Sequence, residues 1–243
     1  MYSEKVETYL KAVYEIEEAH SRAKTSHLSE RLGVSAGSVT EMIQRISSLR
    51  PKLLDYAPQH GVRLTNRGKK AALQVVRRHR LLETFLHDTL RLSWDEVHME
   101  AQALEHHVSE RVADAIYALL GNPTHDPHGE PIPDRRGRLP ATSSRRLADV
   151  EPGETVRVVR IHPHPADFLP YLDRIGIGIG TEVRLLEKAP MEEPMRISVR
   201  GDGQIRERSI GQGAAVRIFV EGIPRERLTD GEGAKPKFSN IRK

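Results

Sequence analysis

The first 65 residues have the apolar spacing of three helices followed by a hairpin. From Glu4 to about Ala19, apolar residues recur every three to four positions, which predicts an amphipathic helix. TSHLSERLGVS and AGSVTEMIQRISSL then predict two short helices joined through Gly33 and Val34, the size of a helix-turn-helix. KLLDY and GVRLT have the character of two short strands, with PQHG as the turn. This order describes a winged helix that ends near Thr65.

A longer helical region follows. The pattern predicts a helix from about Asn66 to Thr89, with Thr65 as its N-cap and with His79 turned toward the interior. A further helix opens near Ser93, and SERVADAIYALLG continues the apolar stripe up to Gly121. These helices have more apolar residues than packing within one subunit requires, so the surplus suits a dimer interface.

The last third of the chain changes character. GNPTHDPHGEPIPDRRGRLPATSS is rich in Pro and Gly and is expected to be a loop and linker. TVRVVRI, TEVRLLE, RISVR and AAVRIFV predict the strands of a small β-barrel, with one helix around PADFLPYLDRIG. Pro170 leaves the extent of that helix open. Residues 223–243 are polar and are expected to form a mobile tail.

Composition narrows the chemistry. The 243 residues contain no cysteine, which excludes disulfides, thiolate metal sites and cysteine nucleophiles and leaves nitrogen and oxygen ligands for any metal. No apolar stretch is long enough for a membrane span and no signal peptide is recognisable, so we expect a cytoplasmic protein without membrane contact. A net charge of +4 permits nucleic-acid binding without requiring it.

Metal-ligand side chains recur at helical spacing. His79 and Glu83 are four residues apart, and a second run contains His98, Gln102, Glu105 and His106. Such offsets place side chains on one helix face, where they can reach a single ion. A lone histidine on a helix is more often a structural residue, but several at this spacing together favour a metal site.

The whole pattern resembles the diphtheria-toxin-repressor family of metal-dependent transcriptional regulators, including its manganese-responsive branch. The resemblance rests on ETYLKAVYEIEE, LGVSAGSVTEMIQRI, RRHRLLE, LEHH, PHGEPIP and LADVEPGETVRVVRI, in this order. It implies an α+β, mainly α fold. We therefore expect a winged-helix DNA-binding domain at residues 1–65, a helical metal-binding and dimerisation domain at 66–140 and an SH3-like domain at 145–222.

The resemblance also implies a first metal site. In the family, the positions of His79, Glu83 and His98 form one site that the C-terminal domain completes. His164 and Asp167 match that completing pair. Some manganese-responsive relatives use a Cys-Pro-His loop instead, which in this chain is Asp126, Pro127 and His128. Both completions remain open, and His125 is equally compatible with a structural role.

A second metal site is implied at Gln102, Glu105 and His106, so we expect two ions per subunit. Relatives have Cys or Glu at position 102, and Met or Asp at position 8, where this chain has Thr8. An amide and a hydroxyl are weaker ligands than a thiolate or a carboxylate. This site is therefore expected to bind loosely, or to recruit Glu4, Glu7 or water.

The donor set predicts the metal. Carboxylate, amide and imidazole groups fit Mn²⁺ better than a thiophilic ion, and Fe²⁺ accepts the same donors. We expect Mn²⁺ as the effector, with Fe²⁺ second.

The expected DNA-binding surface follows from the helix-turn-helix. The N-terminal part of a recognition helix enters the major groove, and Ser35, Ser38 and Thr40 match family positions there. Thr25 and Ser26 begin the preceding helix, where free backbone N–H groups can hold a phosphate, and Arg63 on the wing is a further phosphate contact. Ser26 and Ser35 are equally suited to helix capping.

The resemblance implies a homodimer that binds a palindromic double-stranded operator when it is loaded with metal and that represses metal-uptake genes. We expect neither a small organic substrate nor enzymatic activity. One alternative is a metal-independent winged-helix protein with structural histidines. Another is a metallohydrolase, against which the absence of an HExxH motif argues.

Overall fold

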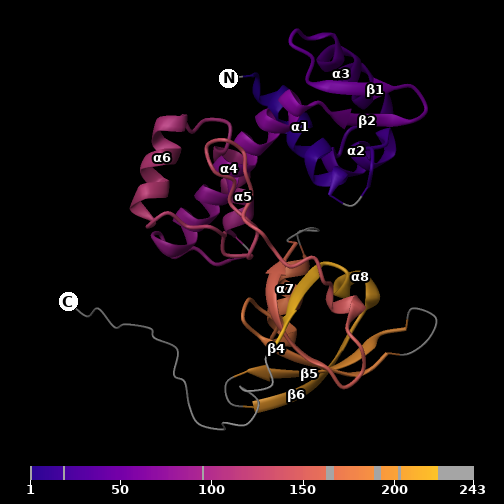
Figure 1. Ribbon diagram of the computed structural model, residues 1–243, viewed down its shortest axis with the longest axis vertical. Coiled ribbons are helices and arrows are strands. Elements are labelled where there is room, and N and C mark those ends of the chain that lie inside the picture. Colours follow the sequence, from indigo (N-terminus) through magenta and orange to yellow (C-terminus); the bar gives the residue numbers. More distant parts are fainter. Residues whose placement is uncertain are drawn as a thin grey trace. The chain divides into compact units, whose positions relative to one another are not determined.

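The computed structural model describes residues 2–223 apart from Ala19, Asp95 and residues 163–166, 189–192 and 202–203. The chain divides into two compact units, residues 1–142 with 162–170, and residues 143–161 with 171–243. Figure 1 shows the helices and strands of the chain, of which one helix, α7 (Phe168–Ile175), has residues in both units. Among the described residues, no helix is both long and apolar enough to cross a lipid bilayer.

The winged helix forms as its apolar pattern predicts. It contains α1 (Glu4–Glu17), α2 (Thr25–Leu32), α3 (Ala36–Ser48), β1 (Leu54–Ala57) and β2 (Gly61–Leu64). Its core includes Leu10, Val13, Leu28, Ile43 and Ile46, all at most 1% exposed. The wing hairpin is antiparallel, with Leu54 opposite Leu64.

Two glycines set the turns of the winged helix. Gly33 ends α2 at φ +65°, a left-handed conformation that glycine adopts without strain. Gly61 begins β2 at φ +87°, and a Cβ there would lie 2.5 Å from the carbonyl oxygen of Ala23. The hairpin can therefore approach Ala23, whose N–H donates to Val62 O and whose carbonyl accepts from Val62 N–H.

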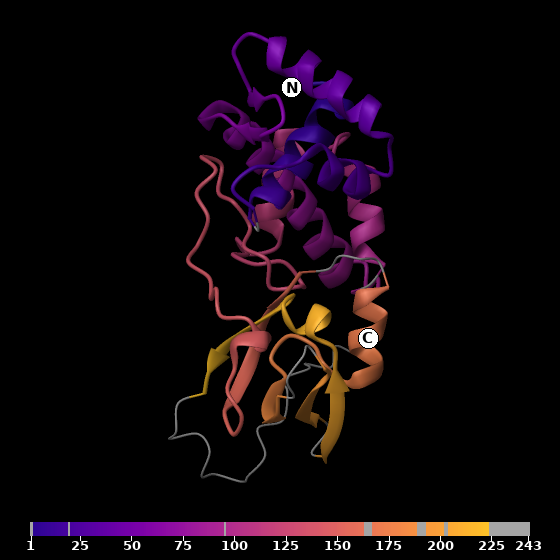
Figure 2. The same ribbon diagram turned by 90° about the vertical axis from the view of Figure 1, so that its right-hand side faces the viewer.

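The helical module is built on α4 (Asn66–Asp88), which packs against α1, α5 (Val97–Leu104) and α6 (Glu110–Leu119) (Figures 1 and 2). Thr65 is its N-cap, as predicted, and accepts a hydrogen bond from the Gly68 N–H at 3.1 Å. Every residue from Arg77 to Thr84 is buried. Charged side chains in this buried middle part of α4 need ion-pair or hydrogen-bond partners. The residues that supply these partners surround the candidate metal site described below.

The second unit contains the 3-10 turn η1 (Leu147–Asp149), β3 (Thr155–Ile161), β4 (Glu182–Glu187), β5 (Met195–Gly201), β6 (Gln204–Ile210), α8 (Gln212–Ala215) and β7 (Ile218–Gly222). Its strands form one antiparallel sheet in the order β6-β5-β4-β3-β7. Val156, Val183, Ile197 and Val220 from four of the strands are buried. The predicted fold class, with its SH3-like C-terminal part, is confirmed.

Three local expectations in the C-terminal part change or gain detail. The expected helix is α7 (Phe168–Ile175), and Pro170 lies in its first turn, where a missing N–H removes no helical hydrogen bond. The run AAVRIFV is not one strand, because its alanines belong to α8 and the strand begins at Ile218. Strand β6 was not predicted, because QIRERSI alternates too weakly in polarity. The tail at 224–243 lies outside the described residues.

Candidate metal centre

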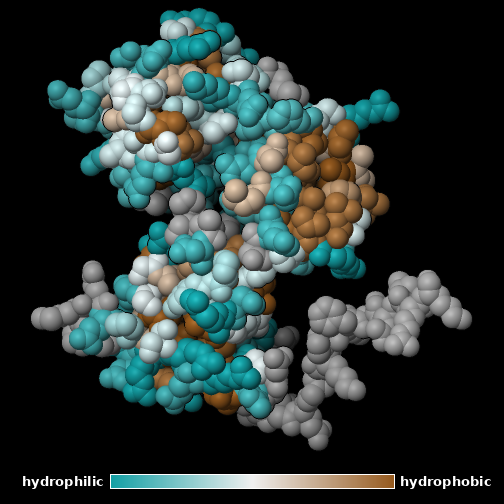
Figure 3. All heavy atoms as spheres, turned by 180° about the vertical axis from the view of Figure 1, so that it is seen from behind, coloured by the Kyte–Doolittle hydropathy of each residue, from teal (hydrophilic) through white to brown (hydrophobic). Residues whose placement is uncertain are grey.

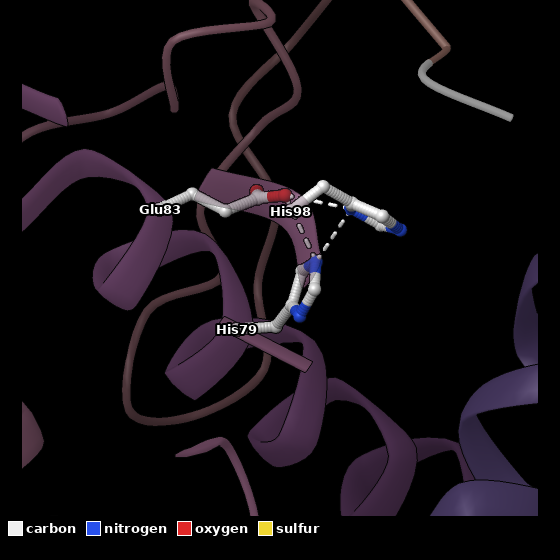
Figure 4. A group of neighbouring side chains, drawn as sticks. All are labelled: His79, Glu83 and His98. Atoms are coloured by element: carbon white, nitrogen blue, oxygen red, sulfur yellow. Dashed lines mark hydrogen bonds and ion pairs between the residues drawn. The ribbon is translucent and has the colours of Figure 1, made fainter. Parts of the chain in front are cut away.

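His79 and Glu83, in the middle of α4, face a histidine of α5. Glu83 lies one turn after His79 on α4, and His98 approaches both from α5 (Figure 4). His79 Nε2 lies 3.0 Å from Glu83 Oε1 and 3.2 Å from His98 Nδ1, while His98 Nδ1 lies 2.9 Å from Glu83 Oε1. His79 and Glu83 are buried, and His98 is half-buried.

These three atoms have the spacing of ligands on one ion. Ligands at about 2.1 Å from an octahedral cation lie about 3 Å apart along each edge of the octahedron. The observed triangle has edges of 2.9–3.2 Å. His79, Glu83 and His98 can therefore occupy one face of an octahedral Mn²⁺ or Fe²⁺ without large movement.

A loop after α6 adds two further donors. Asp126 Oδ1 accepts hydrogen bonds from the N–H groups of His128 and Glu130, at 2.8 and 2.9 Å. His128 is fully buried, and its Nε2 lies 2.8 Å from Trp94 O. Its Nδ1 has no hydrogen-bond partner among the described residues and lies 3.8 Å from Glu83 Oε1. A buried nitrogen left without a hydrogen bond is the kind of atom that a metal ion satisfies.

The ligand-type atoms of Glu83, Asp126 and His128 also lie within 4.8 Å of one another. Glu83 is thus common to the helix triangle and the loop group. We call His79, Glu83, His98, Asp126 and His128 the primary centre.

Arg80 holds the loop of the primary centre against α4. Its guanidinium donates to Pro131 O at 2.5 Å and to Glu130 Oε2 at 3.1 Å, and its Nε lies 3.8 Å from Asp126 Oδ2. Asp126 and Glu130 are the two buried carboxylates that face this guanidinium, and His162 Nδ1 also lies 3.1 Å from Glu130 Oε1. Glu83, the third buried carboxylate of the region, faces His79 and His98 instead. With neutral imidazoles and ionised carboxylates, these three carboxylates and Arg80 carry a net charge of minus two, which a divalent cation would neutralise.

The electrostatics of the primary centre fit a cation. Burial would raise the pKa of Glu83, but His79 and its hydrogen bonds hold that pKa well below the usual range. Burial, followed by the charge of Glu83, raises the pKa of Asp126 well above its ordinary value. Burial lowers the pKa of His128, which leaves its imidazole neutral and its lone pair free. The residues present therefore fit a hard divalent ion.

A second cluster lies on the other side of His79. His79 Nδ1 lies 2.6 Å from Glu105 Oε2, and Lys11 Nζ on α1 lies at the same distance from that oxygen. His106 Nδ1 lies 2.9 Å from Glu7 Oε2. We call Glu7, Thr8, Lys11, Arg78, Glu105 and His106 the second cluster.

Thr8 and Glu7 complete the contacts of the second cluster. Thr8 Oγ1 donates to Glu4 O at 2.9 Å and lies 3.1 Å from His106 Nε2. Arg78 donates to Glu7 Oε2 at 2.6 Å and to the Glu105 carbonyl at 2.7 Å. Burial would raise the pKa of Glu105, but His79 and Lys11 lower it to about 2. Glu7 was anticipated as a recruit to this site, whereas Lys11 and Arg78 were not.

The remaining predicted ligands lie apart from these groups. Gln102 is exposed on α5, away from the buried face that carries Glu105. Asp167 is exposed, and it belongs to neither ligand-type group among the described residues. His164 lies outside the described residues. His125 is exposed in the loop and lies 3.0 Å from the Thr124 hydroxyl.

The expected DNA-binding residues lie on the outside of the winged helix. Ser35 caps α3, accepting from the Ser38 N–H at 3.2 Å, and Thr40 donates its hydroxyl to Ala36 O. Thr25 and Ser26 open α2, whose N-cap residue makes no side-chain hydrogen bond to the first turn. Arg63 is exposed on β2, with its Nε 3.3 Å from Asp55 Oδ2.

Comparison with known proteins agrees with this arrangement. Residues 1–62 match the iron-dependent repressor N-terminal DNA-binding domain, residues 65–134 the iron-dependent repressor metal-binding and dimerisation domain, and residues 145–222 the FeoA domain. The diphtheria toxin repressor of Corynebacterium efficiens is 30% identical over 229 residues, which are 89% of this chain and 96% of that protein. The chain belongs to the diphtheria-toxin-repressor family.

Other members of the family give the same result. The iron-dependent repressor IdeR of Mycobacterium leprae is 34% identical over 70% of this chain and 76% of its own length. The solved structure of a manganese-dependent transcriptional repressor in complex with manganese superposes with a TM-score of 0.83, at 37% identity, and covers 90% of this chain and all of that one. The chain is thus a metal-dependent DNA-binding regulator of the repressor class.

Proposed function

We propose that this protein is a manganese-activated transcriptional repressor. In this proposal a homodimer binds a palindromic double-stranded operator when it is loaded with Mn²⁺, and it represses genes for metal uptake. Fe²⁺ is the second candidate effector. The protein acts in the cytoplasm, where its operator DNA lies, and it has no enzymatic activity.

The observation that carries the proposal is the primary centre. His79, Glu83 and His98 form a triangle of nitrogen and oxygen donors with edges near 3 Å, and the free Nδ1 of His128 faces the same carboxylate. The chain has no thiolate to offer, so the donor set is hard and suits Mn²⁺. A manganese-dependent repressor among the structural neighbours agrees with this choice.

An apolar surface supports the dimer. Several large apolar side chains are exposed on or beside α5 and α6: Leu90, Met99, Leu104, Val112 and Leu119. Figure 3 shows apolar side chains gathered over the helical module on the side of α6. Contiguous exposed apolar surface on a protein marks an interaction site. This surface would bury itself against the same surface of a second copy.

The winged helix supplies the proposed operator contacts. Ser35, Ser38 and Thr40 lie at the exposed start of α3, the part of a recognition helix that enters the major groove. The uncapped start of α2 at Thr25 and Ser26 suits a backbone phosphate, and Arg63 on the wing suits another. Short hydroxyls read bases loosely, so phosphate positioning and DNA shape would dominate recognition.

The contacts between α1 and α4 connect the centre with the winged helix. The primary centre draws donors from α4, α5 and the loop, and Arg78 on α4 holds Glu7 on α1. Fixing α4 and α5 around a cation therefore restrains the base of the winged helix. The metal would act by population shift, because it binds the DNA-competent arrangement more tightly than the alternatives. A coupling of about 1–3 kcal/mol corresponds to a rise in operator affinity of roughly 5- to 150-fold.

A second ion at Gln102, Glu105 and His106 has less support. The Glu105 carboxylate already faces Lys11, and Gln102 is exposed. Completion of the primary centre by the loop has more support than completion by His164 and Asp167, because Asp126 and His128 lie beside Glu83.

Operator binding tests the proposal. A duplex selected from a random pool in the presence of Mn²⁺ would be titrated with protein at fixed free Mn²⁺, at fixed free Fe²⁺ without oxygen, and with chelator. We expect Mn²⁺ to strengthen binding and His98→Ala to abolish that effect. His87→Ala, at a partly exposed histidine of α4 outside the primary centre, is the matched control and should behave like the wild type.

Three outcomes would overturn the proposal. Binding unaffected by chelator would favour a metal-independent winged-helix protein. Activation by Fe²⁺ at far lower free concentration than by Mn²⁺ would reverse the choice of effector. Full Mn²⁺ activation of His98→Ala would remove the primary centre from the mechanism.

A further inference from the structure

Lys11 lies among the ligand-type side chains of the second cluster. Its ammonium lies 2.6 Å from Glu105 Oε2, and the same oxygen lies 2.6 Å from His79 Nδ1. Lys11 is 8% exposed and Glu105 is 2% exposed. Lysine is seldom buried unless it is paired with an acidic group. This ion pair therefore holds α1 against the end of α5.

The charges of the second cluster are already balanced. Its two carboxylates are Glu7 and Glu105, and each faces a buried cation: Arg78 at 2.6 Å and Lys11 at 2.6 Å. With a neutral imidazole at His106 the net charge of the buried groups is zero, and the one further carboxylate on Arg78, that of Glu110 at 2.8 Å, is open to solvent. Adding a divalent ion would leave two positive charges without a buried counter-charge, which is strongly unfavourable.

The neutral donors of the second cluster also have partners. Thr8 Oγ1 donates to Glu4 O and lies 3.1 Å from His106 Nε2, while His106 Nδ1 lies 2.9 Å from Glu7 Oε2. No nitrogen of His106 is left without a hydrogen bond, unlike the buried Nδ1 of His128 in the primary centre. These residues therefore do not fit a second ion.

We propose that the Lys11 ammonium is a built-in replacement for a second metal ion, which pins α1 to α5 and limits this protein to one regulatory ion per protomer. The tether is permanent, so the attachment of the winged helix at this point does not depend on metal supply. The inference rests on the proposed function only for the ion in the primary centre.

The count of bound Mn²⁺ tests the inference on the full-length protein. Equilibrium dialysis against Mn²⁺, with elemental analysis of the protein compartment, should give one ion per protomer for the wild type. Lys11→Glu replaces the ammonium by a carboxylate and brings the charge of the cluster to minus two, that of the primary centre. We expect this variant to bind two ions per protomer.

Two further variants make the result specific. Lys5→Glu changes the charge by the same amount at an exposed lysine of α1 and should still bind one ion. Adding His106→Ala to Lys11→Glu should return the count from two to one, because the new ion then loses its imidazole ligand.

The outcomes separate the two proposals. No bound Mn²⁺ in the wild type would overturn the proposed function. Two ions in the wild type, falling to one in Glu105→Gln, would overturn the role of Lys11 and leave the primary centre intact. A folded Lys11→Glu variant that still binds one ion would also overturn it. If Lys11→Glu does not fold, the wild-type count decides.

Discussion

The primary centre draws its residues from α4, α5 and the loop after α6, whereas the second cluster draws most of its residues from α1 and the end of α5. His79 lies between them, because its Nε2 faces Glu83 and its Nδ1 faces Glu105. Both contain carboxylates and histidines at helical spacing. They differ in their cations, because around the first Arg80 faces two of three buried carboxylates, whereas in the second Lys11 and Arg78 each face one of two. Ligand-type residues are therefore insufficient to define a metal site, and the charge left after internal pairing distinguishes the two regions.

The largest expected effect comes from removing the guanidinium of Arg80 beside the primary centre. Arg80→Met takes away the cation that Asp126 and Glu130 face in this buried region. We expect the free energy of unfolding of the metal-free protein to fall by about 3–5 kcal/mol, measured by urea denaturation. Mn²⁺ should recover part of this loss.

The control for this measurement is Arg67→Met, at an exposed arginine of the same helix, which should change stability by about 0.5 kcal/mol or less. A loss below about 1 kcal/mol in Arg80→Met would mean that the buried carboxylates of the centre do not depend on Arg80.

A smaller effect is expected from Glu83→Gln, which keeps the size of the side chain and removes its charge. Glu83 belongs to both ligand groups of the primary centre. The variant should lose the roughly 5- to 150-fold stimulation of operator binding by Mn²⁺, measured by fluorescence anisotropy. Glu100→Gln, exposed on α5, should retain it. Equal stimulation in both variants would contradict the assignment of Glu83.

In the second cluster, His106→Ala is expected to affect stability and not metal content. It removes the contacts of His106 to Glu7 and Thr8, which should lower the free energy of unfolding by about 1 kcal/mol. Bound Mn²⁺ should stay at the wild-type count. His107→Ala, at the exposed neighbour, is the control. A drop in Mn²⁺ content in His106→Ala but not in His107→Ala would show that the second cluster also binds an ion, against the contrast drawn between the two regions.

The smallest effect concerns an ion pair outside both regions. Arg31 Nη2 lies 2.5 Å from Glu15 Oε2, and although burial alone would raise the pKa of Glu15, Arg31 and Lys11 lower it overall. A lowered folded-state pKa gives stability that is present above the ordinary value of 4.5 and is lost as the pH falls through the folded-state pKa.

Thermal unfolding across this acidic range tests that contribution, which should be about 1 kcal/mol or less. Arg31→Met should flatten the pH dependence relative to the wild type. An unchanged pH profile in the variant would show that Arg31 does not set the pKa of Glu15.

Much of the fold could be predicted because local sequence controls it. The apolar spacing of α1, α3 and α4 predicted their existence and their buried faces, and Thr65 was correctly predicted as the cap of α4. Strand β6 was missed because an exposed edge strand needs no apolar alternation, and its partner β5 supplies the pairing. The alanines before β7 were misassigned because an apolar run has no intrinsic period.

Spacing along the helices and the family resemblance together were enough to nominate the donors, but not to choose among them. His79, Glu83 and His98 meet because offsets of one helical turn on α4 face one residue of α5. Gln102 has the right offset from His98 and nevertheless lies on the exposed side.

The sequence by itself determined the order of elements, the absence of thiolate ligands and the pool of histidines and carboxylates. Only the tertiary structure decided which carboxylates keep their charge unpaired. Lys11 and Glu105 are 94 residues apart in the sequence, a separation far beyond the reach of a local apolar pattern. Their ion pair exists only because α1 and α5 both pack on α4. Coulomb interactions depend on distance in space and on burial, neither of which helical periodicity contains.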